Sequence, residues 1–505
     1  MHTKIFSATP IGINAHLVDV EVDLSFGLIN FFIVGLPDTA IKESRQRIQT
    51  ALKNSGIKLP ERKITVNLAP ASLKKEGTLF DLPIAIGILQ ACKYLQMDAT
   101  FLEETLFIGE LSLDGSIKSI NGALPIAYDG HKLNKKRIIL PEENAHEAAL
   151  IRSIQVIGVK NLVELIYYLR KEQPIAPTIT DFKGYVKSKK TTDLDFADVK
   201  GQQYAKRALQ IAAAGRHNIL FAGPPGSGKT MLAKRLPTIM PDMTFDEAIS
   251  ASKVYSISGK LNSQPLITQR PFRNPHHTIS QAGLIGGGTY PKPGEVSLAH
   301  NGILFLDEFT EFKRDTLEAL RQPLENRVVE IARVQQSVAF PASFLLVAAL
   351  NPCPCGYLGD SKKACVCSPM QIQKYKDKLS GPLLDRIDIK VTVTSVSYDD
   401  AQATRTVDAV SSEKLKVGVA QALQMQQKRF GVEDKSNSMM NANDVEIFCK
   451  LTPQAEELLK QAFIKLSMSM RGYHKTLKVA RTIADIEQAE LIEVKHIQEA
   501  IIYKS

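Results

Sequence analysis

A glycine-rich octapeptide, GPPGSGKT, occupies residues 223–230 and contains the residue types that bind a triphosphate. Its glycines let the backbone curl so that successive N–H groups point at one anion. Lys229 is expected to reach the β- and γ-phosphates of a nucleotide, and the Thr230 hydroxyl is expected to ligate Mg²⁺. The positions expected to contact the nucleotide in this segment are Gly223, Pro224, Pro225, Gly226, Ser227, Gly228, Lys229 and Thr230.

The residues around this loop have the patterns of a strand and a helix. Ile219–Ala222 is a short apolar run typical of a buried parallel strand, and residues 231–236 have the pattern of the first turns of a helix. A strand, a glycine-rich loop and a helix in this order form the context that a phosphate-binding loop requires. This context argues against a Gly/Pro-rich turn with an unrelated lysine. The sequence therefore predicts a nucleotide-binding protein.

Two later apolar runs end in polar residues that would complete such a site. Residues 302–306 are followed by Asp307, which is expected to hold Mg²⁺ mostly through water, and by Glu308, which is expected to orient and deprotonate the attacking water. Residues 344–350 are followed by Asn351, whose amide is expected to hydrogen-bond the γ-phosphate or that water. The alternative for Asn351 is an ordinary residue that starts a turn.

One arginine, Arg386, stands among acidic residues in the segment GPLLDRID at 381–388. It has two interpretations. It forms a surface ion pair of little energetic value, or it is an arginine finger donated to the ATP of a neighbouring subunit.

The chain has six cysteines, and four of them lie within a short window. The clustered residues are Cys353, Cys355, Cys365 and Cys367. In a reducing compartment such clusters indicate metal binding or free thiols rather than disulfides. Four thiolates suit tetrahedral Zn²⁺, which is the favoured interpretation, while free thiols, an iron–sulfur cluster and a redox pair remain alternatives. Cys92 and Cys449 stand alone in apolar surroundings and are expected in the core.

Composition places the chain among globular proteins of ordinary make-up. It has 505 residues, 44% of them hydrophobic and 23% charged, which suffices for about three domains. No apolar run is long enough to cross a bilayer and the N-terminus lacks a signal-peptide core, so a cytosolic location is expected. The formal net charge of +10 permits a polyanionic partner without requiring one.

The first third of the chain alternates strand-like and helix-like segments, which predicts an α/β or α+β domain. FIGELSLDGSIKSINGALPIA at 107–127, LPEENAHEA at 140–148 and VKNLVELIYYL at 159–169 resemble the proteolytic domain of Lon proteases, which has a ribosomal-protein-S5-like fold. At the positions matching the serine and lysine of that peptidase this chain has Ile84 and Leu124, which cannot act as nucleophile and base. The resemblance therefore implies a structural or binding module without peptidase activity.

The middle of the chain carries a more specific resemblance. GPPGSGKT, RPFRNPHHTISQAGLIGGG at 270–288, PGEVSLAHNGILFLDE at 293–308, NPCPCGYLGD and SGPLLDRID resemble the magnesium-chelatase-like branch of the AAA+ ATPases, and within it the YifB/ComM family. This implies an α/β phosphate-loop core with an α-helical lid, assembled as a hexameric ring with ATP sites between subunits. The residues that fall on the family's motif positions are Lys229, Thr230, Asp307, Glu308, Asn351 and Arg386.

The same resemblance implies that two insertions, at 258–288 and at 328–340, line the pore of the ring, the second one as a hairpin. Candidate contacts to DNA phosphates in or beside them are Arg270, Arg273, Arg327 and Arg333. The adjacent residues His276 and His277 form a metal pair or have a packing or subunit-contact role. The second interpretation is preferred, because adjacent loop histidines rarely share one ion.

The C-terminal region has helical apolar spacing at 455–466 and 476–492, as expected of the lid. Arg471 matches the family's second sensor, which contacts the γ-phosphate, and Arg481 is the competing choice. The expected domains are a Lon protease-like domain at 1–172 without the catalytic dyad, a linker at 173–195, an AAA+ core at 196–395 and a lid of the magnesium-chelatase C-terminal type at 396–505.

Taken with the family resemblance, these features predict an ATP-hydrolysing, Mg²⁺-dependent hexameric DNA motor. Helicase or branch-migration activity on branched or single-stranded DNA is expected. The alternative is a chelatase-type ATPase that remodels a partner protein instead of DNA. A third class, an ATP-dependent peptidase, is disfavoured by Ile84 and Leu124.

Overall fold

The computed structural model describes residues 2–59, 61–75, 77–181, 193–261, 264–288, 291–332, 337–360, 363–395, 410–432 and 435–504. The chain folds into two compact units. Unit 1 contains residues 1–189, 245–268 and 332–340, and unit 2 contains residues 190–244, 269–331 and 341–505. Two segments from the middle of the sequence therefore belong to the N-terminal unit, whereas the helical lid belongs to the same unit as the phosphate loop.

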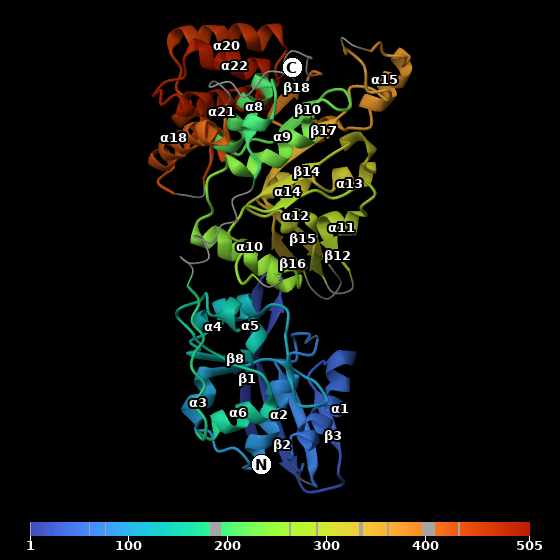
Figure 1. The fold of residues 1–505 in the computed structure, drawn as a ribbon, viewed down its shortest axis with the longest axis vertical. Coiled ribbons are helices and arrows are strands. Elements are labelled where there is room, and N and C mark those ends of the chain that lie inside the picture. The colour runs from blue at the N-terminus through green and yellow to red at the C-terminus, as the bar shows by residue number, and fades with distance from the viewer. Residues whose placement is uncertain are drawn as a thin grey trace. The chain divides into compact units, whose positions relative to one another are not determined.

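Unit 1 is built on a seven-stranded mixed sheet with the order β3-β4-β2-β1-β5-β8-β9 (Figure 1). Strand β2 (Asn14–Ser25) pairs antiparallel with both β1 (His2–Ile11) and β4 (Lys63–Ala69). The remaining strands, β3 (Phe31–Val34), β5 (Thr105–Phe107), β8 (Arg137–Pro141) and β9 (Gln155–Val159), pair with their neighbours in parallel. The helices are α1 (Thr39–Asn54), α2 (Asp81–Ala91), α3 (Ala99–Glu104), α4 (Ala123–Lys132), α5 (Glu142–Ala148), α6 (Leu162–Leu169) and, from the later segment, α10 (Phe245–Ile257).

Helix α2 forms the centre of this unit because it is apolar on all sides. All but one of its residues are buried, as expected of a helix without a polar face. A Cβ added at Gly87 would lie 2.6 Å from Val22 Cγ2, so glycine is what allows the helix to approach the sheet. Ile84 on α2 and Leu124 on α4 are fully buried, and neither side chain has a hydroxyl or an amine to offer.

Unit 2 has a five-stranded parallel sheet with the order β11-β14-β17-β10-β18. Its strands are β11 (Phe272–Arg273), β14 (Ile303–Leu306), β17 (Leu345–Leu350), β10 (Ile219–Ala222) and β18 (Ile389–Thr392). The helices within the core of this unit are α8 (Gln203–Gly215), α9 (Lys229–Arg235), α11 (Gln281–Ile285), α12 (Glu295–Leu298), α13 (Arg314–Glu318), α14 (Arg321–Asn326), α15 (Pro369–Lys376) and α16 (Gly381–Leu384). The short strands β12 (Gly286–Gly287) and β13 (Lys292–Pro293) pair at the end of the first predicted insertion. The second predicted insertion contains β15 (Val328–Ala332) and β16 (Ser337–Pro341), and its residues 332–340 belong to unit 1.

The lid consists of helices that gather at one end of unit 2 (Figure 1). They are α18 (Ser412–Phe430), α19 (Ala442–Phe448), α20 (Pro453–Lys465), α21 (Met470–Ile486) and α22 (Val494–Ile502). The carboxylate of Asp485, which is fully buried, accepts hydrogen bonds from Arg429 on α18 and Arg481 on α21. Asn437 Nδ2 also donates to it, at 2.7 Å. This network ties the lid helices to one another.

The α/β phosphate-loop core with a helical lid is confirmed, and a mixed α/β domain precedes it. The segment that begins α21 starts at Met470, so Arg471 lies in the first turn of that helix rather than ahead of it. Within the part of the chain that the structure describes, no helix combines the length and apolar character needed to span a membrane.

Candidate nucleotide-binding site

The sheet order of unit 2 brings the expected chemical groups to one edge. Strands β14, β17 and β10 are consecutive neighbours and run parallel, with Leu306 opposite Ala348 and Ala222 opposite Leu350. The residues that follow these three strands therefore emerge side by side. This places the phosphate loop next to Asn351, and Asp307 one strand further along.

The phosphate loop needs its glycines for two different reasons. Gly226 and Gly228 have φ angles of 77° and 91°, a left-handed conformation that strains residues with a side chain. At Gly223 there is no room for a side chain, since a Cβ there would lie 2.2 Å from the carbonyl oxygen of Val393. The Ser227 hydroxyl is buried and has no hydrogen-bond partner among the described residues. An unpaired buried hydroxyl in this loop is available to a phosphate oxygen.

Lys229 is buried against the loop and lies ready to meet an anion. Its Nζ donates to the carbonyl oxygens of Gly223 at 2.7 Å and Pro224 at 2.9 Å, and to Asn351 Oδ1 at 3.3 Å. Burial lowers the pKa of this amine, and the nearby Asp307 carboxylate opposes that shift. A desolvated ammonium next to Asn351 gains strongly from a phosphate that replaces the carbonyl contacts.

Thr230 and Asp307 form the oxygen-rich part of the site. The Thr230 hydroxyl donates to Asp307 Oδ2 at 2.7 Å, and Asp307 Oδ1 accepts from the backbone N–H of Glu308 at 3.0 Å. A hydroxyl and a carboxylate at this distance are the hard oxygen ligands that Mg²⁺ prefers, and magnesium usually keeps several waters besides them. The donor set therefore fits a magnesium ion held by these two residues.

Glu308 has a partner that the sequence did not reveal. Its backbone is left-handed, with φ of 50°, and its carboxylate Oε2 lies 3.0 Å from His277 Nδ1. The two residues meet because Arg273 of β11 pairs with Leu304 of β14, and each lies four residues beyond that pair. The packing role preferred for His277 therefore consists of a contact with Glu308, the expected general base. This contact could be predicted only from the pairing of β11 with β14, and a strand of two residues cannot be recognised in the sequence.

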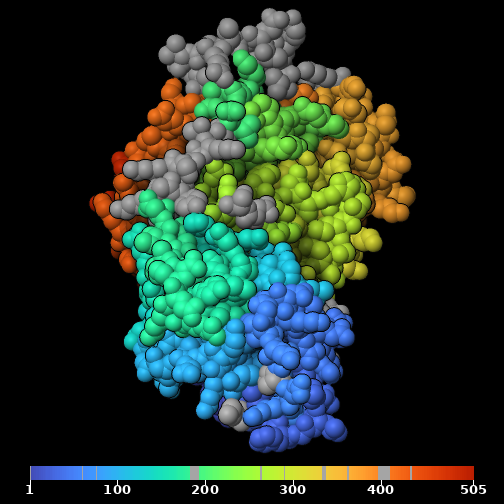
Figure 2. All heavy atoms as spheres, turned by 60° about the horizontal axis from the view of Figure 1, so that its bottom comes forward, coloured from blue at the N-terminus to red at the C-terminus, as the bar shows by residue number. Residues whose placement is uncertain are grey.

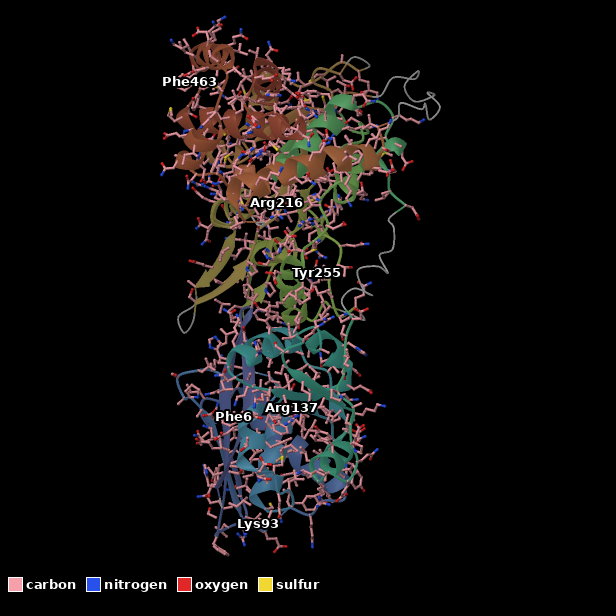
Figure 3. The ribbon with its side chains drawn as sticks, turned by 90° about the vertical axis from the view of Figure 1, so that its left-hand side faces the viewer. Phe6, Lys93, Arg137, Arg216, Tyr255 and Phe463 are labelled. Carbon is pink, nitrogen blue, oxygen red and sulfur yellow. The ribbon has the colours of Figure 1, made fainter. Side chains whose placement is uncertain are left out.

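Arg386 and Arg471 lie together on a separate cavity. Both guanidinium groups contact the Glu325 carboxylate, and the Arg471 contact is 3.7 Å long. The cavity has a volume of about 420 Å³, and none of residues 223–230 lines it. Its basic lining residues are Arg216, which Figure 3 labels, Arg327, Arg386, Arg471, Lys475 and Lys478. The Nε atom of Arg386 is buried without an acceptor in the described part of the chain.

Arg481 is excluded as the second sensor by its surroundings. Its side chain is 1% exposed, and its Nε donates to Asp485 Oδ1 at 3.0 Å. Its Nη1 donates to the carbonyl oxygen of Glu490 at 2.7 Å. The residue stabilises the lid, which leaves Arg471 as the sensor candidate.

Comparison with known proteins identifies the family. Models of the magnesium chelatase subunit ChlI match residues 195–401 and 20–144, and a model of the C-terminal part of that subunit matches residues 409–504. Competence protein ComM of Haemophilus influenzae is 44% identical over 505 residues, covering 99% of this chain and 97% of ComM. YifB of Escherichia coli is 40% identical, covering 100% of this chain and 96% of YifB. The chain belongs to the ComM/YifB family.

This family is a magnesium-chelatase-like group of AAA+ ATPases, which agrees with the strand order and the phosphate loop of unit 2. The N-terminal region has a weaker similarity of another kind. Lon protease 2 of Bacillus subtilis is 30% identical over 127 residues, which cover 25% of this chain and 22% of that protease.

Two of the arginines expected at the pore of this ComM/YifB family member are used internally. Arg270 is buried, and it donates to the carbonyl oxygens of Pro241 at 2.6 Å and Asn301 at 2.8 Å. Arg273 forms a paired contact with the carboxylate of Glu295 at 2.6 and 2.8 Å. The expectation of a DNA contact is therefore wrong for Arg270, and Arg273 is held in β11 by its ion pair.

The other two arginines expected at the pore are Arg327 and Arg333. Arg327 is part of the basic cavity, where burial lowers its pKa to about 10. Arg333 lies outside the described residues.

The four clustered cysteines of this family member meet in space. Their sulfur atoms all lie within 4.8 Å of one another, with 3.3 Å between Cys353 and Cys355 and 3.6 Å from each of these to Cys365. The sulfur of Cys367 accepts from the backbone N–H of Cys355 at 3.4 Å. Cys92 and Cys449 are separate free cysteines. Cys449 is buried in the lid core as expected, whereas Cys92 is only half-buried.

Proposed function

We propose that this protein is an ATP-hydrolysing, Mg²⁺-dependent hexameric motor that acts on branched or single-stranded DNA in the cytoplasm. The observation that supports it most is two hydrogen-bonded pairs, Lys229 with Asn351 and Thr230 with Asp307. They meet where three adjacent parallel strands end. Each of these side chains has the chemistry that phosphoryl transfer needs at its position.

In the proposed reaction the phosphate loop binds the triphosphate and Lys229 exchanges its carbonyl contacts for phosphate oxygens. Thr230 and Asp307 would hold a magnesium ion, which would supply positive charge against the phosphates. Glu308, oriented by His277, accepts a proton from the attacking water. Asn351 positions that water or the γ-phosphate.

The position of two arginines supports an assembly in which subunits share ATP sites. Arg386 and Arg471 share Glu325 and line a cavity to which the phosphate loop of the same chain does not contribute. An arginine finger acts by neutralising transition-state charge on the phosphates. We therefore propose that both arginines serve the ATP of a neighbouring subunit, which requires a ring or another assembly.

DNA as the substrate rests on similarity to ComM, which is named a competence protein. The alternative is remodelling of a partner protein, which the similarity to a magnesium chelatase subunit supports. We propose that unit 1 has no peptidase activity and serves as a binding module, because Ile84 and Leu124 stand where a serine and a lysine are needed. We also propose that the four clustered thiols bind Zn²⁺, since their mutual distances suit one ion.

The test measures ATP turnover with and without forked or four-way DNA, read beside a strand-separation gel. We expect DNA to stimulate hydrolysis and the fork to be separated. Glu308→Gln is expected to bind ATP and assemble without turnover, whereas Glu413→Gln, an exposed carboxylate at the start of α18, retains the parental rate. A protein that hydrolyses ATP equally with and without DNA and separates no strands refutes the DNA motor and leaves the chelatase-type function.

A further inference from the structure

The cysteine cluster lies against the nucleotide site rather than on a remote surface. Cys353 comes two residues after Asn351 at the end of β17, and its side chain is fully buried. In Figure 2 the light-orange atoms on the right, from the part of the chain that follows β17, border the green and yellow-green atoms of unit 2. The loop that carries the cysteines therefore begins at the sensor residue.

A second contact joins this loop to the phosphate loop itself. Gly356, which follows Cys355, has φ of 86° and is buried. A Cβ added there would lie 2.6 Å from Pro225 Cδ and 2.9 Å from Pro225 Cγ, so the two loops touch without room for one more carbon. Any displacement of the cysteine loop is transmitted to the phosphate loop because the packing is this close.

A third contact runs through Tyr375 on α15, the helix that follows Cys367. The Thr310 hydroxyl donates to the Tyr375 hydroxyl, which also lies close to the backbone of Asn351 and to Cys353. Thr310 is two residues beyond Glu308. The segment from Cys353 to Tyr375 thus contacts the ends of β14 and β17 as well as the loop after β10.

The sulfur positions fit one tetrahedral zinc ion. With Zn–S bonds of about 2.3 Å, the sulfur atoms of such a site lie about 3.8 Å from one another. The observed separations of 3.3 and 3.6 Å are close to that value, and all pairs lie within 4.8 Å. An iron–sulfur cluster needs wider spacing because several metal ions stand between its cysteines. A disulfide needs a sulfur–sulfur bond of about 2.05 Å, which none of these pairs has.

We propose that a zinc ion bound by Cys353, Cys355, Cys365 and Cys367 holds Asn351 and the phosphate loop in their ATP-binding positions, so that occupancy of the metal site controls ATP binding and turnover. This rests on the proposed ATP site and on the proposed zinc ligands, but not on the proposed DNA substrate. Without the ion, four thiols have no bond that closes the loop, and Gly356 is free to leave Pro225. The phosphate loop then loses the packing contact with Gly356 that holds its conformation.

The first experiment compares the full-length parent, Cys365→Ser/Cys367→Ser and the control Cys92→Ser, whose cysteine lies in unit 1. Zinc content is measured by elemental analysis, ATP affinity with a fluorescent ATP analogue, and folding by circular dichroism. We expect one zinc per chain in the parent and the control and none in the double variant. ATP affinity in the double variant should fall at least tenfold with secondary structure retained. A parent without zinc, or a zinc-free variant with parental ATP affinity, overturns the proposal.

A second experiment avoids variants altogether. Zinc is removed from the parent with a chelator and replaced by Co²⁺, whose absorption reports the geometry of four thiolate ligands. We expect ATP affinity to fall on removal and to return with either metal, and we expect added ATP to shift the cobalt spectrum. A spectrum that ATP leaves unchanged, or affinity that survives removal, contradicts the coupling. Because these measurements contain no DNA, a failure of the DNA motor leaves them untouched.

Discussion

Gly223 offers the sharpest test of how the phosphate loop is built. Replacing it by alanine adds one methyl group whose carbon would lie 2.2 Å from the Val393 carbonyl oxygen. Carbon and carbonyl oxygen atoms in proteins approach to about 3.3 Å, so the two must separate by about 1 Å. The φ angle of Gly223 is not in the left-handed region, and the effect is therefore one of space alone.

The required movement has two possible outcomes. If β18 moves, the hydrogen bond from Val393 N–H to the Ala222 carbonyl oxygen, 2.8 Å long, is weakened, and the protein loses about 1 kcal/mol of stability. If the loop moves, the triphosphate is misplaced by about 1 Å, for which a loss of about 100-fold in turnover is typical. That loss corresponds to about 2.7 kcal/mol of transition-state stabilisation.

The assay measures kcat and KM for ATP together with the thermal midpoint of unfolding. We expect Gly223→Ala to lose about 100-fold in kcat/KM while its melting temperature changes by only a few degrees. The control Gly381→Ala adds the same methyl where no other atom lies within 4 Å, and it should keep parental stability and ATP affinity. A Gly223→Ala protein with parental kcat/KM would show that the contact with Val393 does not position the loop.

Three further variants test individual contacts. Thr230→Val keeps the shape but removes the hydroxyl that donates to Asp307, and we expect turnover to fall about 100-fold at low Mg²⁺ and to recover in part at high Mg²⁺. A loss that is the same at every Mg²⁺ concentration would contradict its role as a ligand. His277→Ala removes the partner 3.0 Å from Glu308, so we expect kcat to fall about tenfold with KM unchanged in steady-state kinetics. A KM effect alone would point to a packing role. Glu325→Gln weakens the ion pair that holds Arg386 and frees this arginine to bind the ATP of a neighbouring subunit. We therefore expect the variant to reach half-maximal ATPase activity at a lower protein concentration than the parent. A specific activity that does not depend on protein concentration argues against action on a neighbour.

The sequence predicted the parts of the site that strand ends determine. Apolar runs that stop at Asp307 and Asn351 can be recognised in one dimension, and parallel strands bring such ends to one edge. The contact between His277 and Glu308 could not be predicted, because it depends on the pairing of a strand only two residues long. The predicted DNA contact of Arg270 failed because its guanidinium already donates to backbone carbonyl oxygens. An arginine in a sequence gives no sign of such contacts.

The fold was predicted to a similar depth. The helical spacing at 455–466 predicted α20 close to its observed bounds, Pro453–Lys465, whereas β18 could not be predicted because a short buried strand lacks a period of its own. The sequence also could not predict that residues 245–268 belong to unit 1, since this results from packing between segments far apart in the chain.

That placement of α10 limits how the protein can be shortened. The helix packs on α4, where the Gly122 backbone N–H donates to the Ser256 carbonyl oxygen at 3.2 Å and the Lys253 ammonium stands 4.3 Å from the centre of the Tyr128 ring. Deleting residues 1–189 would expose Ile249 and Val254 of α10 to water, although both lie beyond the deletion. Such a fragment should be prone to aggregate whatever the state of its ATPase centre. A trimmed version suited to crystallisation or biophysics must remove or replace residues 245–268 together with the N-terminus.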